Sequence, residues 1–585
     1  MVSGQGLSRV LYVDLTRRRY WSEDRREIFE KYMGGAGAAI QLLQEECRKG
    51  TDPLGSDNPI VLCVGPLTGL FPLASKTVAM FKSPLTGNLG ESHAGGRSAV
   101  AIRSAGYGGI VVGGSSPSPI YVVVHGDKVS FKDASGLWGV RSAITVGRVI
   151  RDLEPNPGIR TIMRIGKAGE RMVSFSSVTT ETFRHFGRLG LGAVFGSKKL
   201  KALVVSGKKV LPLKEIKFYR ETYDEIFNAA TRTELMKKYH DLGTPMSVLP
   251  LNELGALPTR NLKEARFEAA ETLSGESLAK GFLGRRVACA HCPVACIHIA
   301  ALKEPYEREP YFYKITMISY DYELIYALGS MLGIRDVADL LKLIHEVEIQ
   351  GMDAISTGVA LAWATEATEK GFINEEDIGG VRLSWGDSHS YQRAMTMIVD
   401  QPTDFFKDLA RGVAFASAKY GGSDFALAFG GNEMPGYHTG PASYAGYLTG
   451  ARHSHLDGAG YGIDEKSKAG EAFVPSIAAE KLLEEEVWRQ ILSSLVVCYF
   501  ARAIYRPSLV LKTLRAVGQE LTEDELRNLG LEILKAKNAF KVREGFDPKN
   551  LAIPGRIAET PSPKGIISRE GVQQTTKAFF EKLNI

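Results

Sequence analysis

SAGYGGIVVGGSSPSPIYVVVH, residues 104–125, is the longest segment of the chain without an acidic or basic side chain, and it decides between a membrane helix and a sheet. It contains five glycines and two prolines, which interrupt the run of about 20 apolar residues that a membrane helix needs. Its two apolar runs, GIVV and IYVVV, are rich in β-branched side chains, which favour strands. The stretch therefore predicts strand, turn and strand.

Similar β-branched runs occur on both sides of this stretch, for example VLYVDL at 10–15, PIVLCV at 59–64 and ALVVSG at 202–207. Their spacing is typical of sheet strands joined by turns. After about residue 212 the apolar side chains recur with the 3.6-residue period of helices. We expect helices at 337–347, 353–370, 478–500 and 523–537, the second of them with Asp353 or Ser356 as N-cap and Gly371 after its end.

These patterns predict an α+β fold in three parts. A sheet-rich N-terminal domain covers residues 1–211, and two mostly helical domains follow at 212–420 and 421–585. No internal repeat and no low-complexity linker separates them.

The composition is that of an ordinary globular protein. The 585 residues include 44% apolar and 24% charged side chains, which excludes a disordered, collagenous or coiled-coil chain. The 72 basic and 66 acidic side chains leave a net charge of +6, too dilute over this length to indicate a nucleic-acid partner. No segment predicts a membrane span, and the N-terminus lacks the apolar core of a secretory signal. We therefore predict a cytoplasmic protein.

Three of the six cysteines lie within eight residues, in the sequence RRVACAHCPVACIHIA at 285–300. Cys289, Cys292 and Cys296 have the spacing C-x2-C-x3-C, and Cys498 follows about 200 residues later. Three thiolates on one tight loop can bind three corners of a [4Fe-4S] cluster, and a distant fourth thiolate can bind the last.

Two alternatives compete with an iron–sulfur cluster. Tetrahedral zinc uses similar cysteine sets. Radical-SAM enzymes use the reverse order, C-x3-C-x2-C, and leave one iron open, so a fourth cysteine argues against them. Cys47 and Cys63 lie in apolar contexts, and we expect them to be small buried side chains without a metal.

Two segments combine glycine with positive charge, at 76–96 and 184–201. Glycines allow close backbone approach, and free N–H groups beside Arg and Lys can bind phosphate. Neither segment has the strand and G-x-G-x-x-G context of a dinucleotide site, so NAD is not expected. Together they indicate a cofactor with more than one phosphate.

With these cysteine, glycine and basic segments taken together, the chain resembles the aldehyde ferredoxin oxidoreductase family. Its members are tungsten enzymes with two pterin dithiolenes on one metal. The resemblance runs over essentially the whole chain and includes the four cysteines. Its blocks are GPLTG at 65–69, KSPLTG at 82–87, AGYGGIVV at 105–112, GRLGLGAVFGSKKLKA at 187–202, YALGSMLGI at 326–334 and GMDAISTG at 351–358.

The resemblance implies an N-terminal domain that forms a base for the pterins. The implied cofactors are a tungsten or molybdenum bis-pterin, a Mg²⁺ ion between the pterin phosphates, and the [4Fe-4S] cluster on Cys289, Cys292, Cys296 and Cys498. The implied pterin contacts are Lys76, His93, Gly95, Arg184, His185, Gly187, Arg188, Glu348, Met352, Asp353, Arg452, Ser493 and Tyr499.

Several positions depart from the family pattern. The two pterin motifs D-x-x-G-L-(D/C) are replaced by EIQGMD at 348–353 and SSLVVC at 493–498. His93 stands where the family has asparagine, and Asp457 where it has a lysine near a phosphate. These changes indicate a divergent subfamily.

The resemblance also aligns the family's active-site glutamate with Glu323, next to Tyr320, Asp321 and Tyr322. A carboxylate among aromatic side chains has a raised pKa, suited to taking up a proton. The second acid–base candidate is a histidine in ARHSHLDGAGYGID, at 451–464. Its two histidines are His453 and His455, and we prefer His455.

The resulting hypothesis is an oxidoreductase that converts an aldehyde to a carboxylic acid and passes electrons to ferredoxin or to an iron–sulfur partner subunit. A second hypothesis keeps the fold and cofactors but makes the protein a low-potential reductase of another substrate, such as an aromatic acyl-CoA. A third is a non-catalytic iron–sulfur or zinc scaffold.

The best-known members of the family carry a mononuclear iron between two identical subunits. Its Glu and His ligands align here with Lys342 and Gln392. A charged lysine ammonium cannot bind iron, so we predict that this bridge is missing.

Overall fold

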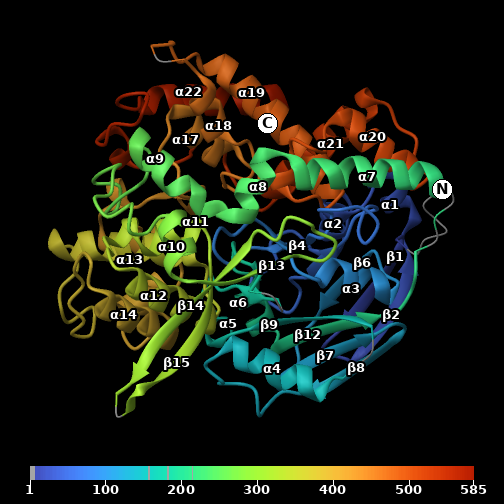
Figure 1. Ribbon diagram of the computed structural model, residues 1–585, viewed down its shortest axis with the longest axis horizontal. Coiled ribbons are helices and arrows are strands. Elements are labelled where there is room, and N and C mark those ends of the chain that lie inside the picture. The colour runs from blue at the N-terminus through green and yellow to red at the C-terminus, as the bar shows by residue number, and fades with distance from the viewer. Residues whose placement is uncertain are drawn as a thin grey trace.

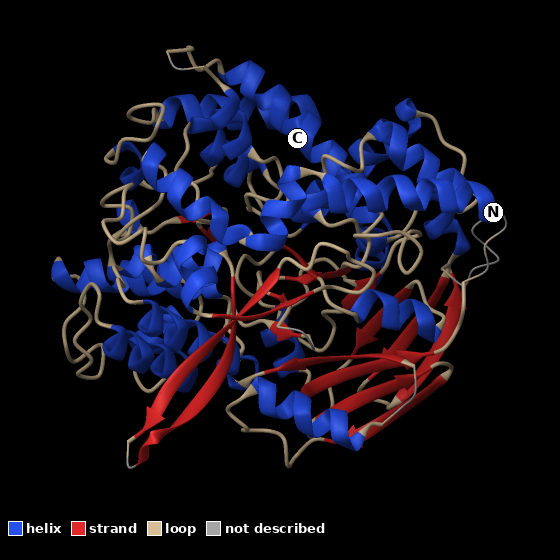
Figure 2. Cartoon of the chain, in the orientation of Figure 1, coloured by secondary structure: helices blue, strands red, loops and turns tan. Residues whose placement is uncertain are grey.

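The computed structural model describes residues 7–155, 158–180, 183–211, 213, 215–307, 309–468 and 470–585. Figure 1 shows the strands of the N-terminal part on one side of the molecule, with the helices of the rest of the chain covering them from two directions. Figure 2 shows the same division by secondary structure. The α+β fold, with a sheet-rich N-terminal part followed by helical parts, is therefore confirmed.

The opening stretch of sequence contributes to both large sheets. Its first strand, β6, runs parallel to β1 in one six-stranded sheet. Its second, β7, runs parallel to β12 in the other six-stranded sheet. The Ser- and Pro-rich turn between them therefore connects two sheets and does not close a hairpin.

The first sheet has the order β2-β1-β6-β3-β4-β5. Its strands are β1 (Arg9–Asp14), β2 (Arg19–Asp24), β3 (Ile60–Cys63), β4 (Thr77–Lys82), β5 (Leu89–Ala94) and β6 (Gly109–Gly113). The second has the order β11-β10-β9-β12-β7-β8. Its strands are β7 (Ile120–His125), β8 (Lys128–Asp133), β9 (Ile159–Ile165), β10 (Val178–Thr179), β11 (His185–Phe186) and β12 (Leu200–Gly207).

Short helices connect these strands. They are α1 (Arg26–Tyr32), α2 (Gly35–Glu46), α3 (Ser98–Ala105), α4 (Ala143–Leu153), α5 (Lys167–Glu170) and α6 (Leu191–Ser197). The middle of the chain adds α7 (Ile216–Arg232), α8 (Glu234–Asp241), α9 (Val248–Leu254), α10 (Gly275–Gly281), α11 (Tyr322–Leu328), α12 (Val337–Gln350), α13 (Ala354–Glu369), α14 (Ser388–Asp400), α15 (Asp404–Leu409) and α16 (Val413–Tyr420).

The remainder of the chain contributes α17 (Pro441–Thr449), α18 (Gly460–Lys466), α19 (Pro475–Ser494), α20 (Pro507–Ala516), α21 (Glu523–Arg543) and α22 (Arg569–Leu583). Short 3₁₀ turns complete it: η2 (Thr244–Ser247), η3 (Ser330–Leu332), η4 (Ser423–Phe425), η5 (Tyr499–Ala501) and η6 (Gly555–Ala558). A small ribbon is formed by β16 (Ala428–Phe429) and β17 (Asn432–Glu433).

The predicted helices at 337–347, 353–370 and 523–537 are confirmed as α12, α13 and α21. Asp353 is the N-cap of α13, because its carboxylate accepts hydrogen bonds from the N–H groups of Ile355 and Ser356.

The predicted helix at 478–500 is wrong at its C-terminal end, because α19 stops at Ser494. Val496 has a φ of 56°, a left-handed conformation that a β-branched residue rarely adopts. The carbonyl of Val496 accepts a hydrogen bond from Lys76 N–H (3.2 Å). Tertiary hydrogen bonding to the N-terminal part therefore replaces the last helical turn.

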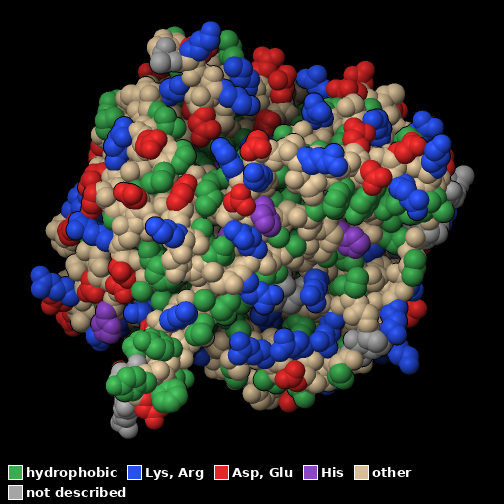
Figure 3. Space-filling view, viewed as in Figure 1, with side chains coloured by type: hydrophobic (Ala, Val, Ile, Leu, Met, Phe, Trp, Pro, Cys, Tyr) green, Lys and Arg blue, Asp and Glu red, His purple; other side chains and the backbone are tan. Residues whose placement is uncertain are grey.

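A three-stranded sheet interrupts the helical middle of the chain, contrary to the mostly helical expectation for 212–420. It comprises β13 (Leu283–Val287), β14 (Ile297–Tyr306) and β15 (Glu309–Tyr320). Figures 1 and 3 show the β14–β15 hairpin projecting from the body, with exposed hydrophobic side chains near its tip. The aromatic and β-branched residues of YFYKITMI, at 311–318, were the strand signal.

The apolar cores follow the sheets and helices. One cluster fills the N-terminal part, and another holds side chains from both sides of residue 420. The domain boundaries near 211 and 420 therefore stay predictions. Within the described ranges, no helix is both long and apolar enough to cross a membrane.

Candidate functional site

The loop with three cysteines, residues 288–296, lies between β13 and β14. Its backbone turns tightly, because His291 and Ala295 both have left-handed φ angles, 55° and 53°. Cys292 N–H donates to the carbonyl of Cys289 (3.2 Å). We call residues 288–296 the thiol loop.

Backbone hydrogen bonds of Leu73 link Cys498 to the thiol loop. Its N–H donates to the carbonyl of Leu73 (2.8 Å), and Leu73 N–H donates to the carbonyl of His291 (3.1 Å). All six cysteines are free thiols. Burial and the nearby thiols of Cys498 and Cys289 together raise the pKa of Cys296 to about 12. Burial and the other three thiols likewise raise the pKa of Cys292. The four cysteines predicted to act together thus interact electrostatically.

The geometry of these thiols bears on the zinc alternative. In the part of the chain that the structure describes, no three His, Cys, Asp or Glu side chains are arranged to hold a single metal ion. A structural zinc site needs four ligands close enough to bind one ion. The choice between a zinc ion and an iron–sulfur cluster on these thiols stays a prediction.

Positive charge surrounds the buried side of the thiols. A Cβ atom at Gly95 would lie 2.8 Å from Cys289 Sγ and 3.4 Å from Lys76 Nζ, so glycine allows this close approach. Burial disfavours the charge of Arg184, but Cys289 and Asp321 outweigh this effect and raise its pKa.

A cavity of about 310 Å³ opens beside Cys498. Most of the predicted site residues line it: Lys76, His93, Arg184, His185, Gly187, Arg188, Glu323, Glu348, Met352, Asp353, His455 and Tyr499. Predicted residues outside the lining are Gly95, Arg452, His453 and Ser493, together with the three thiols of the loop.

Several buried polar atoms around the cavity have no hydrogen-bond partner. They are Arg184 Nε, Arg188 Nη1, both carboxylate oxygens of Glu348, Glu323 Oε1 and His455 Nδ1. Leaving such groups unpaired is costly. A heterocyclic cofactor with N–H groups, carbonyls and phosphates would supply partners for them, so the residues present fit a bound pterin.

Glu323 and His455 both line this cavity, with 3.5 Å between Glu323 Oε1 and His455 Nε2. Asp321 caps α11, which places Glu323 in its first turn. Burial raises the pKa of Glu323 to about 8, although a hydrogen bond from Gly436 N–H opposes the shift. Burial lowers the pKa of His455 well below its usual value, and nearby guanidinium groups add to this effect.

His453 has a different environment. It is buried, its Nδ1 contacts the carbonyl of Tyr447 (2.9 Å), and Lys541 Nζ lies 3.0 Å from its Nε2. His453 therefore lies behind the cavity wall, whereas His455 lines the cavity. The geometry supports the preference for His455 as the acid–base histidine.

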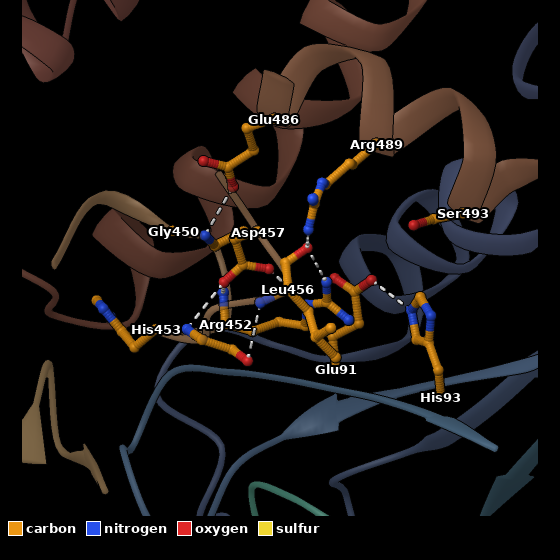
Figure 4. Close-up of polar contacts among 12 residues, drawn as sticks. Glu91, His93, Gly450, Arg452, His453, Leu456, Asp457, Glu486, Arg489 and Ser493 are labelled. Atoms are coloured by element: carbon orange, nitrogen blue, oxygen red, sulfur yellow. Dashed lines mark hydrogen bonds and ion pairs between the residues drawn. The ribbon is translucent and has the colours of Figure 1, made fainter. Parts of the chain in front are cut away.

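Figure 4 shows a buried polar network around Arg452 and Asp457. Arg452 Nε donates to Asp457 Oδ1 (2.6 Å), and Arg452 Nη2 lies 3.4 Å from the Tyr499 hydroxyl. Ser493 Oγ also bonds to that hydroxyl. Arg452 and Ser493, predicted as pterin contacts, therefore contact Tyr499, and Tyr499 lines the cavity.

His93 belongs to a second group of buried ionisable side chains, which the sequence did not reveal. Its Nε2 lies 2.7 Å from Glu91 Oε1, and Lys537 Nζ of α21 lies 2.5 Å from Glu91 Oε2. Burial lowers the pKa of His93 to about 4, although Glu91 opposes the shift. The imidazole is thus neutral at pH 7.

Two models of protein families together match most of the chain. Residues 10–207 match the model "Aldehyde ferredoxin oxidoreductase, N-terminal domain", and residues 220–583 match "Aldehyde ferredoxin oxidoreductase, domains 2 & 3". The chain belongs to the aldehyde ferredoxin oxidoreductase family.

Relatives with similar sequences agree with this assignment. The tungsten-containing aldehyde ferredoxin oxidoreductase of Thermococcus kodakarensis is 31% identical over 567 residues, which cover 92% of this chain and 89% of that protein. The "Aliphatic sulfonate oxidoreductase, WOR-like subunit" of Pyrococcus furiosus is 29% identical over 431 residues, or 70% of this chain and 67% of that one.

A solved structure shares the fold. The active-site complex of benzoyl coenzyme A reductase with 1,5-dienoyl-CoA matches with a TM-score of 0.82, covering 99% of this chain and 94% of that chain at 21% identity. At this identity the likeness establishes the architecture alone.

Within this aldehyde ferredoxin oxidoreductase fold, residues 434–437, MPGY, form a strap over Glu323 that the sequence analysis missed. Three buried tyrosine hydroxyls hold its backbone: Tyr326 donates to the carbonyl of Met434, Tyr322 to that of Gly436 and Tyr447 to that of Tyr437. The strap in turn donates Gly436 N–H to Glu323 Oε2 (3.1 Å). Pro-Gly was the available signal, but it also marks ordinary turns.

We expect Gly436→Ala to disturb this strap. The added Cβ would lie 2.7–2.9 Å from ring atoms of Tyr326 and Tyr322, and relieving such overpacking costs about 1–3 kcal/mol. Denaturant unfolding should show this loss, and activity should fall because Glu323 loses its N–H donor. Gly462→Ala, where a Cβ has no neighbour within 4 Å, is the matched control. Equal stability of the two variants would contradict the role of the strap.

Proposed function

We propose that this protein is a tungsten or molybdenum bis-pterin oxidoreductase that oxidises an aldehyde to its carboxylic acid. Electrons pass through a [4Fe-4S] cluster to ferredoxin or to an iron–sulfur partner subunit. One observation carries the proposal: the same cavity is lined by Cys498 of the four-thiol set and by the Glu323–His455 pair. A cytoplasmic location stays a prediction.

The residues that would hold the cofactors follow from their positions. Arg184, Arg188 and Glu348 offer unpaired polar atoms to the pterins, Lys76 adds positive charge, and the four cysteines would bind the cluster. The bound bis-pterin metal supplies two-electron oxidation, and the cluster relays electrons singly.

Side chains of this protein accept and orient the protons that the reaction releases. Oxidation of an aldehyde with one water gives a carboxylic acid, two protons and two electrons. Glu323 Oε1 is the atom placed to accept a proton, because Oε2 is occupied by Gly436 N–H. His455 stays neutral, and its Nε2 lies 3.5 Å from Glu323 Oε1, where it can orient the carboxyl group as Glu323 gains and loses that proton.

The raised pKa of Glu323 predicts a pH dependence. The carboxyl group is protonated below about pH 8, and only the carboxylate can act as a base. We expect kcat/KM for the aldehyde to rise with pH through an apparent pKa near 8. A pH profile of Glu323→Gln that keeps the same rise would assign it to another group.

Metal and pterin analysis tests the function itself. Anaerobically purified protein should contain about four irons per chain, one tungsten or molybdenum, and pterin detectable by fluorescence after oxidative release. Iron with neither tungsten nor molybdenum would overturn the proposal. Protein that contains iron but no pterin would instead support the non-catalytic scaffold.

A second candidate keeps the cofactors and changes the substrate to an aromatic acyl-CoA that is reduced at low potential. The altered pterin motifs at 348–353 and 493–498 and the fold shared with benzoyl coenzyme A reductase motivate it. Anaerobic assays with aldehydes and with aromatic acyl-CoA esters separate the two. Activity on the esters alone would favour the reductase.

A further inference from the structure

The thiol loop reaches the surface of the protein, and backbone hydrogen bonds through Leu73 connect it to Cys498 at the cavity. Ala288 and His291 are exposed, Cys289 and Cys292 are half-buried, and Cys498 lines the cavity. Electrons that reach the loop from the cavity therefore have a short path to the surface through residues 288–292.

Two elements with exposed basic side chains flank this outlet. The helix α8 contacts the loop through His240 Nδ1, 2.8 Å from the carbonyl of Val294. The strand β13 leads directly into the loop, and Arg286 Nη2 donates to the carbonyl of Asp241 at the end of α8 (3.4 Å). We define the basic rim as the exposed residues Lys237, Lys238, Arg285 and Arg286.

The charge of the basic rim is not neutralised within the protein. Among the residues that the structure describes, none of its four side chains forms an ion pair with a carboxylate. Glu234 and Asp241 are the exposed acids on α8, and β13 has none. Figure 3 views this face and shows Lys and Arg side chains gathered over α8 and β13, around exposed histidine.

We propose that the basic rim is the docking surface of an acidic protein that carries one electron at a time. The inference rests on the proposed function, in which two electrons must leave singly through the thiol loop. Electron transfer slows steeply with distance, so the acceptor must dock over residues 288–292. Unneutralised cations around that point attract an acidic partner and orient it.

The same charges would also attract nucleic acid. The thiol loop at the centre of the rim and the interruption by Glu234 and Asp241 favour a protein carrier over a continuous phosphate backbone. A duplex DNA probe is therefore included in the test as the competing outcome.

The test reverses the charge of three residues of the basic rim in the full-length holoenzyme. In the triple variant Lys237→Glu/Lys238→Glu/Arg285→Glu, kcat/KM for an acidic [4Fe-4S] ferredoxin should fall by about 10-fold or more at low salt, since steering changes association rates by 10–10³-fold. Aldehyde-dependent reduction of a small viologen dye should not change. The control is Lys407→Glu/Lys577→Glu, which alters two exposed lysines on α15 and α22.

Direct binding of the same ferredoxin, measured with and without 0.5 M NaCl, gives a readout that needs no turnover. Wild-type binding should weaken in salt, and the triple variant should bind weakly in both conditions. Unchanged ferredoxin binding by the triple variant, or rim-dependent binding of DNA without binding of ferredoxin, would overturn the inference. Failure of aldehyde-dependent dye reduction in the wild type would instead count against the proposed function.

Discussion

Replacing Cys498 with serine is expected to damage the iron–sulfur cluster and to stop electron delivery to ferredoxin. Serine retains the size of the side chain but is a poor ligand for iron. We expect the iron content to fall to about three per chain or the cluster to become oxygen-labile, while tungsten or molybdenum stays bound. Ferredoxin-dependent turnover should drop by about 100-fold or more, because Cys498 is the thiol that adjoins both the cavity and the loop.

Cys63→Ser and Cys47→Ser are the matched controls. Both thiols are buried, and burial raises the pKa of each, so they stay protonated. Each substitution should cost on the order of 1 kcal/mol in stability with full iron content. Iron analysis and electron paramagnetic resonance of the three variants are the measurements. A normal cluster signal with normal ferredoxin turnover in Cys498→Ser would mean that another residue is the fourth ligand.

Replacing Glu323 with glutamine is expected to lower kcat for aldehyde oxidation on the order of 10²- to 10⁴-fold, the usual contribution of a general base. The amide has the same shape, and its oxygen can still accept the hydrogen bond from Gly436 N–H. It cannot take up a proton at pH 7. Metal, pterin and iron contents should therefore match the wild type.

Asp339→Asn is the control for this variant, because Asp339 is also an acid in the first turn of a helix but is 38% exposed at the surface. It should change kcat by less than about twofold, since exposed ion pairs contribute little. Steady-state kinetics with a viologen dye compare the two without involving the carrier protein. Equal rates for Glu323→Gln and the wild type would remove Glu323 from the mechanism.

Local sequence patterns predicted much of the fold because they report local physics. The β-branched runs at 109–112 and 120–124 became strands, and the 3.6-residue periodicity became α12, α13 and α21. Such patterns do not reveal which sheet a strand joins, because pairing depends on distant segments. The hairpin of β14 and β15 was missed although residues 311–318 are rich in aromatic and β-branched side chains, because much of the surrounding sequence is helical.

The candidate site was predictable in its chemistry and less so in its geometry. The spacing of Cys289, Cys292 and Cys296 indicated a shared metal group, and family resemblance supplied Glu323. Two histidines two residues apart could not be told apart from sequence. Packing separates them, since His453 turns toward Lys541 and His455 toward Glu323.

The sequence by itself determined many of the strands and helices, which cysteines can share a metal group, and the family, since all three are encoded in the order of neighbouring residues. The tertiary structure alone decided where Cys498 lies. A Cβ at Gly35 or at Gly65 would come within 2.3–2.6 Å of backbone oxygens near the end of α19, so these glycines let the end of that helix pack directly against the N-terminal part. Val496 then leaves the helix to bond with Lys76. That contact joins residues more than 400 positions apart, and no local pattern reports it.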